Sequence, residues 1–231
     1  MINPKEIEKY ATTISLERLE SYIKDNAVSV ESVIDKYADN IKMSQAFYPE
    51  LCVLEVTLRN SIDFMLRKYI SETWIEDEIK NNFLLDDYDH NTIVKAYNDT
   101  LKECKSNSKV FTVGKVIANL NFGFWTNICC KKYSISIWHK KDCYRSVFVN
   151  YPNKKQEIGK ISTKLYLIRR LRNRVFHYEQ IFKYPKNTLR LFNEIKEFLS
   201  YLPDNGNSDI LAKTSIFMDT YNKLTRNFSE N

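Results

Sequence analysis

Residues 156–178 read QEIGKISTKLYLIRRLRNRVFHY, the most regular hydrophobic pattern in the second half of the chain. The apolar residues recur every three or four positions, as they do on one face of an α-helix. The predicted buried face consists of Ile158, Ile161, Leu165, Ile168, Leu171, Val175 and Phe176. The stretch therefore predicts one long amphipathic helix that packs against other helices.

Similar helical patterns recur along the rest of the chain. One helix is expected to start after Ser29, and Pro49 is expected to open a longer one. Further helices are expected over residues 91–103, 110–128, 188–201 and 209–224. Residues 76–90 are predicted to be irregular, and 134–138 to be a short strand or further helix. Because only 4 Gly and 5 Pro occur in 231 residues, we predict an all-α fold, a bundle of about six to eight helices.

The composition is that of an ordinary globular protein. Hydrophobic residues make up 43% and charged residues 28% of the 231 positions, enough chain for one large or two small domains. We expect a single domain over residues 1–231, with residues 1–48 as a candidate N-terminal helical extension. No apolar run reaches the roughly 20 residues that span a bilayer, and residues 1–25 are charged and unlike a secretory signal. A cytoplasmic protein without membrane contact is therefore predicted.

The cysteines and sequence motifs give no indication of a metal ion or an organic cofactor. The five cysteines include no CxxC motif and no Cys/His pair at zinc spacing, so they are predicted to be reduced core thiols. They are Cys52, Cys104, Cys129, Cys130 and Cys143. The signatures of P-loop NTPases, dinucleotide-binding folds, HExxH metalloproteases and GxSxG hydrolases are all missing. No metal and no cofactor is therefore expected.

The charge of the chain is unevenly distributed. Its formal net charge is +6, but residues 131–174 hold thirteen basic residues against Asp142 and Glu157. That segment carries +11, which leaves −5 for the remainder of the chain. One strongly basic segment indicates a polyanionic partner such as RNA, although a lysine-rich surface exposed to solvent explains the charge equally well.

Residues 172–179, RNRVFHYE, combine groups that can cleave RNA. On a helix, Asn173 and His177 are four residues apart and share a face, so the amide can orient the imidazole. The long side chain of Arg172 can reach a phosphate near that ring. A histidine can take the proton from a ribose 2′-OH, and a guanidinium can stabilise the phosphorane that forms. On spacing alone, a structural hydrogen bond or a solvated helix face is the more common explanation of such residues.

Three stretches resemble the Abi-like proteins, the AbiD/AbiF abortive-infection group within the HEPN superfamily of helical ribonucleases. Residues 170–182, RLRNRVFHYEQIF, are similar to the family signature, which reads close to LRNRxxHHEPI. Residues 54–60, LEVTLRN, resemble its early LExxLRN helix, and residues 120–125, LNFGFW, resemble its central LxFGFW block. The RNxxxH core is kept, whereas Tyr178 and Gln180 stand where a second His and a Pro are common. The resemblance covers most of the chain, in the order of the family.

The resemblance implies a HEPN-type helical bundle with additional helices, and a metal-independent endoribonuclease that acts as a toxin in phage defence. It further implies an RNA substrate, a homodimer and, for some members, a small noncoding RNA that restrains the protein. The catalytic residues are then Arg172, Asn173 and His177. The residues expected to bind RNA are Lys131, Lys132, Lys140, Lys141, Arg145, Arg169, Arg174 and Tyr178. The alternative function is a non-catalytic RNA-binding or scaffolding module of the same superfamily.

Several further residues have two interpretations. Glu55 and Arg59 can line the RNA site, but an ion pair between them, four residues apart, is the favoured interpretation. Residues 123–125 are predicted to be a packed core corner rather than a platform for stacking bases. His90 is expected to lie in a loop or a helix cap, and residues 138–140 are expected to face the surface or RNA.

Overall fold

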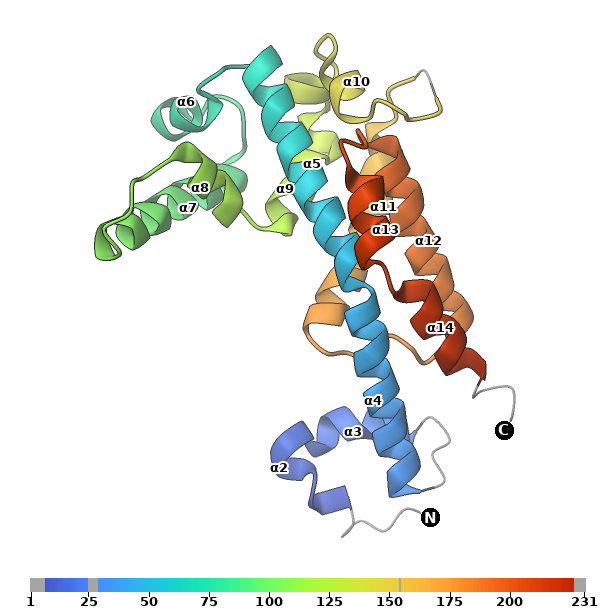
Figure 1. Cartoon of the computed structure of the whole chain (residues 1–231). Helices are drawn as coiled ribbons and strands as arrows, with labels where there is room; N and C mark the ends of the chain where they lie inside the picture. The colour runs from blue at the N-terminus through green and yellow to red at the C-terminus, as the bar shows by residue number, and fades with distance from the viewer. Residues whose placement is uncertain (1–6, 25–28, 154, 227–231) are drawn as a thin grey trace. The chain divides into compact units, whose positions relative to one another are not determined.

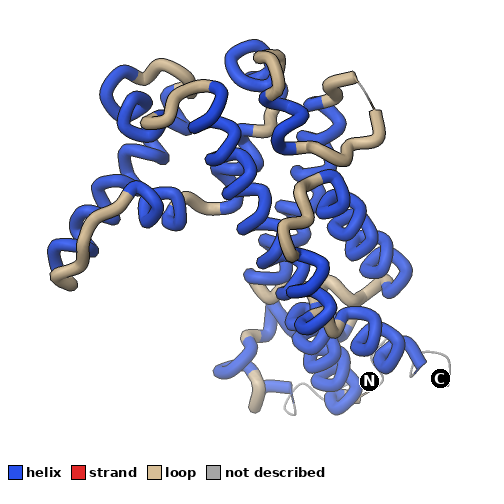
Figure 2. The backbone as a smooth tube through the Cα atoms, turned by 45° about the horizontal axis from the view of Figure 1, so that its top comes forward, coloured by secondary structure: helices blue, strands red, loops and turns tan. Residues whose placement is uncertain are grey.

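The computed structural model describes residues 7–24, 29–153 and 155–226, which form helices and the loops between them (Figures 1 and 2). No strand occurs among these residues, so the predicted all-α class is confirmed. Within the same ranges, no helix is both long and apolar enough to cross a membrane. The chain divides into two compact units. One contains Met1–Cys52, Arg170–Lys196 and Gly206–Asn231, and the other contains Val53–Arg169 and Glu197–Asn205.

The first unit contains helices from both ends of the chain (Figure 1). Its helices are α2 (Ala11–Ile14), α3 (Leu16–Ile23), α4 (Val30–Ala46), α13 (Asn207–Thr214) and α14 (Phe217–Arg226), with parts of α5 (Tyr48–Tyr69), α11 (Ile158–Phe176) and α12 (Pro185–Tyr201). Residues 1–48 therefore share this unit with later segments of the chain. The predicted start after Ser29 is confirmed, because the Ser29 hydroxyl caps α4 by accepting a hydrogen bond from the Ser32 amide at 3.1 Å.

Aromatic and aliphatic side chains form the core of the first unit. The Phe192 and Phe217 rings stack with centroids 3.7 Å apart, and the Phe47 ring packs edge-on at 4.8 Å from Phe217. A smaller cluster that includes Leu19 and Tyr22 joins α3 to α4. These contacts fix the helices that surround the end of α11.

In the second unit, α7 contacts α6, α8 and α9. Its elements are α6 (Trp74–Asn81), α7 (Asp87–Ser106), α8 (Val113–Asn119), α9 (Phe122–Ile128), the 3-10 turn η1 (Lys131–Tyr133), the π-helical turn η2 (Ser134–Trp138) and α10 (Cys143–Val147), with the remaining parts of α5, α11 and α12. The side chains of Trp74, Trp125 and Trp138 are fully buried there. The predicted core corner at residues 123–125 is thus confirmed.

Several boundaries differ from the prediction. The acidic stretch 76–90, predicted to be irregular, contains α6 and the start of α7. The expected helix 110–128 is divided at Leu120, where the backbone is extended and Asn121 caps the next helix. The expected helix 209–224 is likewise divided at Ser215, whose backbone is also extended. These divisions give the described residues more helices than the six to eight predicted.

Three side chains are placed differently from the prediction. Phe176, expected on the buried face of α11, is 40% exposed, while the other predicted residues of that face are buried. Cys52 is an exposed thiol and not a core residue. Trp138, expected at the surface, is buried and donates from its indole Nε1 to the Ile128 carbonyl at 2.7 Å.

Candidate functional site

The predicted catalytic stretch lies at the C-terminal end of α11. The Tyr178 amide donates to the Val175 carbonyl at 3.3 Å, and the Glu179 amide donates to the Arg174 carbonyl at 2.9 Å. This pair of hydrogen bonds is the Schellman motif that ends many helices. Tyr178 occupies the left-handed position of the motif with φ 59°, where glycine is usual and a side chain costs roughly 1–2 kcal/mol. The surrounding contacts must therefore hold this backbone in place.

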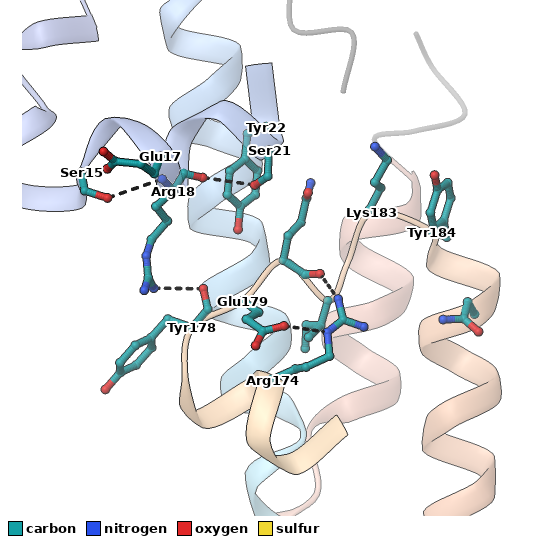
Figure 3. Close-up of a pocket in the computed structure, with 13 residues that line it drawn as sticks. Ser15, Glu17, Arg18, Ser21, Tyr22, Arg174, Tyr178, Glu179, Lys183 and Tyr184 are labelled. Carbon is teal, nitrogen blue, oxygen red and sulfur yellow. Dashed lines mark hydrogen bonds and ion pairs between the residues drawn. The ribbon is translucent and has the colours of Figure 1, made fainter. Parts of the chain in front are cut away.

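Arg18 on α3 binds the outside of this helix end. Its Nη1 donates to the carbonyl oxygens of His177 at 3.3 Å and Tyr178 at 3.1 Å (Figure 3). Its guanidinium carbon also lies 5.8 Å from the centroid of the Tyr178 ring. A positive charge at the carbonyl end of a helix is favourable because the helix dipole is negative there.

Asn40 on α4 holds the segment after the helix from the inside. Its Nδ2 donates to the Glu179 carbonyl at 3.0 Å, and its Oδ1 accepts from the amides of Ile181 at 2.7 Å and Phe182 at 3.1 Å. The Asn40 side chain is 2% exposed, so water does not replace these contacts. One buried amide thus satisfies three backbone groups of the segment that follows the motif.

The three predicted catalytic residues have different surroundings. Arg172 is partly buried, with its guanidinium carbon 4.6 Å from the centroid of the Phe176 ring. Asn173 and His177 are exposed, and the bond between them joins the His177 amide to the Asn173 carbonyl at 2.8 Å. Among the described residues, the His177 imidazole makes no hydrogen bond or ion pair. The geometry leaves this ring open to a ligand, and no side-chain contact from Asn173 orients it.

Two of the residues predicted to bind RNA lie at the same helix end. Arg174 donates from Nε to the Glu179 carboxylate at 3.2 Å, and its Nη2 donates to the Gln180 carbonyl. Tyr178 is 63% exposed beside Arg18. Both residues line a pocket of about 790 Å³ in the first unit, together with side chains of α3 and of residues 179–187 (Figure 3).

Lys132 and Arg169, in the second unit, have structural partners that the sequence did not indicate. The Lys132 ammonium lies 2.6 Å from the Asp86 carboxylate and 2.7 Å from that of the buried Asp89. Burial works to lower the pKa of Lys132, but these two carboxylates outweigh it and raise the pKa above its ordinary value. Arg169 donates from Nη1 to the Thr126 hydroxyl at 3.1 Å and to the Asn127 side-chain oxygen at 3.0 Å. Both cations thus join segments of the second unit.

The other four basic residues predicted to bind RNA are one arginine with structural partners and three exposed lysines. Arg145 donates to the carbonyl oxygens of Tyr151 at 3.2 Å and Asn153 at 2.5 Å, which holds a loop. Lys131, Lys140 and Lys141 are exposed. Of the cations in this unit that were predicted to bind RNA, these three lysines are the most available to a phosphate backbone.

Glu55 and Arg59 lie on α5 in the second unit and are both half-buried. Arg59 donates from Nε to the Asn60 side-chain oxygen at 3.3 Å. The ion pair expected between Glu55 and Arg59 stays a prediction. The role of these two residues in lining an RNA site stays a prediction.

The other histidines and the cysteines do not add a second candidate site. His90 lies within α7, and its Nδ1 is 3.1 Å from a carboxylate oxygen of the fully buried Glu78. His139 is exposed after η2. Burial raises the pKa of the Cys129 thiol, and the neighbouring Cys130 adds to that effect. Across the described ranges, no group of three or more His, Cys, Asp or Glu side chains could hold a metal ion.

Sequence reasoning missed Arg18 and Asn40. These residues lie 139 to 160 positions before the backbone groups that they bind. Neither belongs to a motif, and an arginine or asparagine on an amphipathic helix is usually a surface residue. No signal in a single sequence pairs them with residues 177–182. Comparison of the chain with protein-family models, with curated proteins and with solved structures gives no match.

Replacing Asn40 by alanine should destabilise the protein. The change leaves one carbonyl and two amides buried without a partner, so we expect the free energy of unfolding to fall by about 3 kcal/mol. Urea unfolding measures this loss, and hydrogen exchange should accelerate at the amides of Ile181 and Phe182. Asp35→Ala, at an exposed position of α4, is the control and should change stability by less than about 0.5 kcal/mol. Equal effects of the two changes would contradict the role of Asn40.

RNA affinity should depend on Lys140 and Lys141. If these exposed lysines contact phosphates, replacing both by alanine should reduce the slope of log affinity against log salt by about 1.4, because each single-strand contact contributes about 0.7. Filter binding across a salt series measures that slope. The control is Lys95→Ala with Lys102→Ala, which removes the same charge from exposed positions of α7. A slope that changes equally in both double variants would show an effect of net charge alone.

Proposed function

We propose that this protein is a metal-independent endoribonuclease that cleaves RNA through Arg172 and His177. The observation that carries the proposal is the exposed imidazole of His177 at the end of α11, within one helical turn and a half of the partly buried Arg172. Arg18 and Asn40 hold the backbone around this pair. A fixed backbone limits the positions that the two side chains can reach, which favours proton transfer and charge stabilisation at one place.

The proposed chemistry uses only groups of the protein and the RNA. The imidazole takes the proton of a ribose 2′-OH, and the 2′ oxygen attacks the adjacent phosphorus. The Arg172 guanidinium stabilises the negative charge of the phosphorane, and the bond to the 5′ oxygen then breaks as that oxygen receives a proton. The products are a 2′,3′-cyclic phosphate and a 5′-hydroxyl end. DNA lacks the 2′-OH and is not a substrate of this reaction.

The biological role follows from the resemblance to the Abi-like group. A cytoplasmic ribonuclease toxin in phage defence fits the RNxxxH stretch of residues 172–177. A noncoding RNA that covers the site would restrain such a toxin. These parts of the proposal rest on the sequence resemblance, whereas the chemistry rests on named side chains.

Removing the imidazole or the guanidinium should abolish cleavage. We expect His177→Ala and Arg172→Ala each to reduce cleavage of labelled RNA by at least about 100-fold, the usual contribution of a proton-transfer group. His139→Ala is the matched control, because it removes another exposed imidazole of the chain. Gel analysis of the products should show cyclic phosphate ends, and excess EDTA should leave the rate unchanged.

The contrary outcomes separate the alternatives. RNA binding without cleavage in the wild type would favour a non-catalytic RNA-binding or scaffolding module. Loss of cleavage together with loss of folded structure in His177→Ala would assign that residue a structural role.

We further propose a homodimer in which the two copies of His177 act together. The reaction needs one group to remove a proton and another to donate one, and each chain has one histidine in the motif. A two-fold axis, the commonest oligomeric symmetry, supplies the second copy. If the site is shared, adding excess inactive His177→Ala subunits to wild type should reduce activity as heterodimers form. Activity that tracks the wild-type chains alone, or a monomeric mass in solution, would contradict the shared site.

A further inference from the structure

The hydroxyl of Tyr22 is buried at the wall of the pocket in the first unit without a hydrogen-bond partner among the described residues. The side chain is 1% exposed, and its ring lies in the small core of α3 and α4, 5.6 Å from the Tyr37 ring. Figure 3 shows the hydroxyl directed toward the space between Arg18 and Arg174. Buried hydroxyls normally have a partner, because an unsatisfied one destabilises the fold. The orphan group therefore indicates a ligand that supplies an acceptor.

The charges around the pocket favour an anion. Arg18, Arg174 and Lys183 line it, against Glu17 and Glu179. The Glu179 carboxylate pairs with Arg174, and the formal charges of the lining residues sum to +1. The hydrogen bonds of Arg18 to the two carbonyls run from Nη1, which is one of the three nitrogen atoms of a guanidinium. The cations and the Tyr22 hydroxyl together are suited to a phosphate group.

The remaining lining residues suit a nucleotide base. Tyr184 is 65% exposed at the pocket, and its face offers an aromatic surface on which a base can stack. The amides of Gln180 and Asn187 also line the pocket, and such groups donate to and accept from base edges. A volume of about 790 Å³ lies within the usual range of small-ligand sites.

We propose that this pocket binds one nucleotide of a single-stranded RNA. The pocket lies beside the C-terminal end of α11, where Arg18 binds the carbonyl oxygens of His177 and Tyr178. The phosphate of the nucleotide accepts from the Tyr22 hydroxyl and lies near Arg18 and Lys183, and its base stacks on Tyr184. The strand is single because a concave pocket takes an unstacked base, whereas the bases of a duplex are stacked and paired. The inference rests on the proposed ribonuclease function and names the part of the substrate that the pocket holds.

The sharpest test is Tyr22→Phe in a His177→Ala protein, which cannot cleave the probe. The change deletes only the buried hydroxyl, so the melting temperature should stay the same or rise, while affinity should fall about tenfold. The probe is a fluorescein-labelled RNA of about 12 nucleotides, followed by fluorescence anisotropy. Tyr144→Phe is the control, since it deletes a buried hydroxyl of the second unit and should leave affinity unchanged. A structural hydroxyl would give the opposite pattern, with lower melting temperature and normal affinity.

Two further variants test the positions of base and phosphate. Tyr184→Leu should weaken binding at least about fivefold, and Tyr184→Phe should restore it because the ring is kept. Lys183→Ala should reduce the salt slope by about 0.7, the contribution of one single-strand phosphate contact. Equal affinity of Tyr184→Leu and Tyr184→Phe would overturn stacking at this residue.

The outcomes separate the pocket from the ribonuclease. Unchanged affinity in Tyr22→Phe, with cleavage that still requires His177, would overturn the pocket and keep the proposed function. Weakened binding in Tyr22→Phe, with no cleavage by the wild type, would keep the pocket as an RNA site and overturn the ribonuclease. Tighter binding of a duplex than of the single strand, or displacement of the probe by free AMP but not by unlabelled RNA, would overturn the single-stranded RNA as ligand.

Discussion

The backbone that follows α11 depends on the buried side-chain amide of Asn40. The chain leaves the helix through a left-handed tyrosine, a conformation that costs energy for any residue with a Cβ atom. Asn40 compensates by satisfying the Glu179 carbonyl and the amides of Ile181 and Phe182 in a site closed to water. Arg18 adds hydrogen bonds to the carbonyls of His177 and Tyr178. Arg18 and Asn40, both within the first 48 positions, thus hold the backbone beside His177.

The basic residues show why net charge is a weak guide to a nucleic-acid surface. A segment of charge +11 indicates a polyanionic partner, but carboxylates of the fold neutralise part of that charge. Lys132 is paired with Asp86 and Asp89, which lie more than forty residues earlier in the sequence. Arg169 and Arg145 bind neutral oxygens of neighbouring segments and so fix loops and helices. The exposed Lys140 and Lys141 keep their charge at the surface.

Local pattern predicts local structure well in this chain. The spacing of apolar residues in 156–178 predicts α11, and Ser29 predicts the start of α4, because both depend on residues within a few positions of each other. Phe176, in the last turn of α11, departs from the pattern: it is 40% exposed, and its ring centroid lies 4.6 Å from the Arg172 guanidinium carbon and 6.2 Å from the Tyr48 ring centroid. The contacts of Arg18 and Asn40 could not be predicted, since hydrogen bonds across more than a hundred residues leave no periodicity. The same limit hid the pocket beside Tyr22, whose walls come from distant segments.

The side chains of the three stretches that carry the resemblance have different surroundings in the structure. In LNFGFW the aromatic side chains are buried, and Arg169 donates to the helix that they start. In LEVTLRN the leucines are buried and Arg59 bonds to its neighbour. Both blocks are explained by packing, so they say little about chemistry. In RNRVFHYE, Arg174 donates a hydrogen bond to the Glu179 carboxylate at the end of α11. The exposed imidazole of His177 makes no hydrogen bond to the residues that the structure describes. The proposed catalysis therefore rests on that side chain.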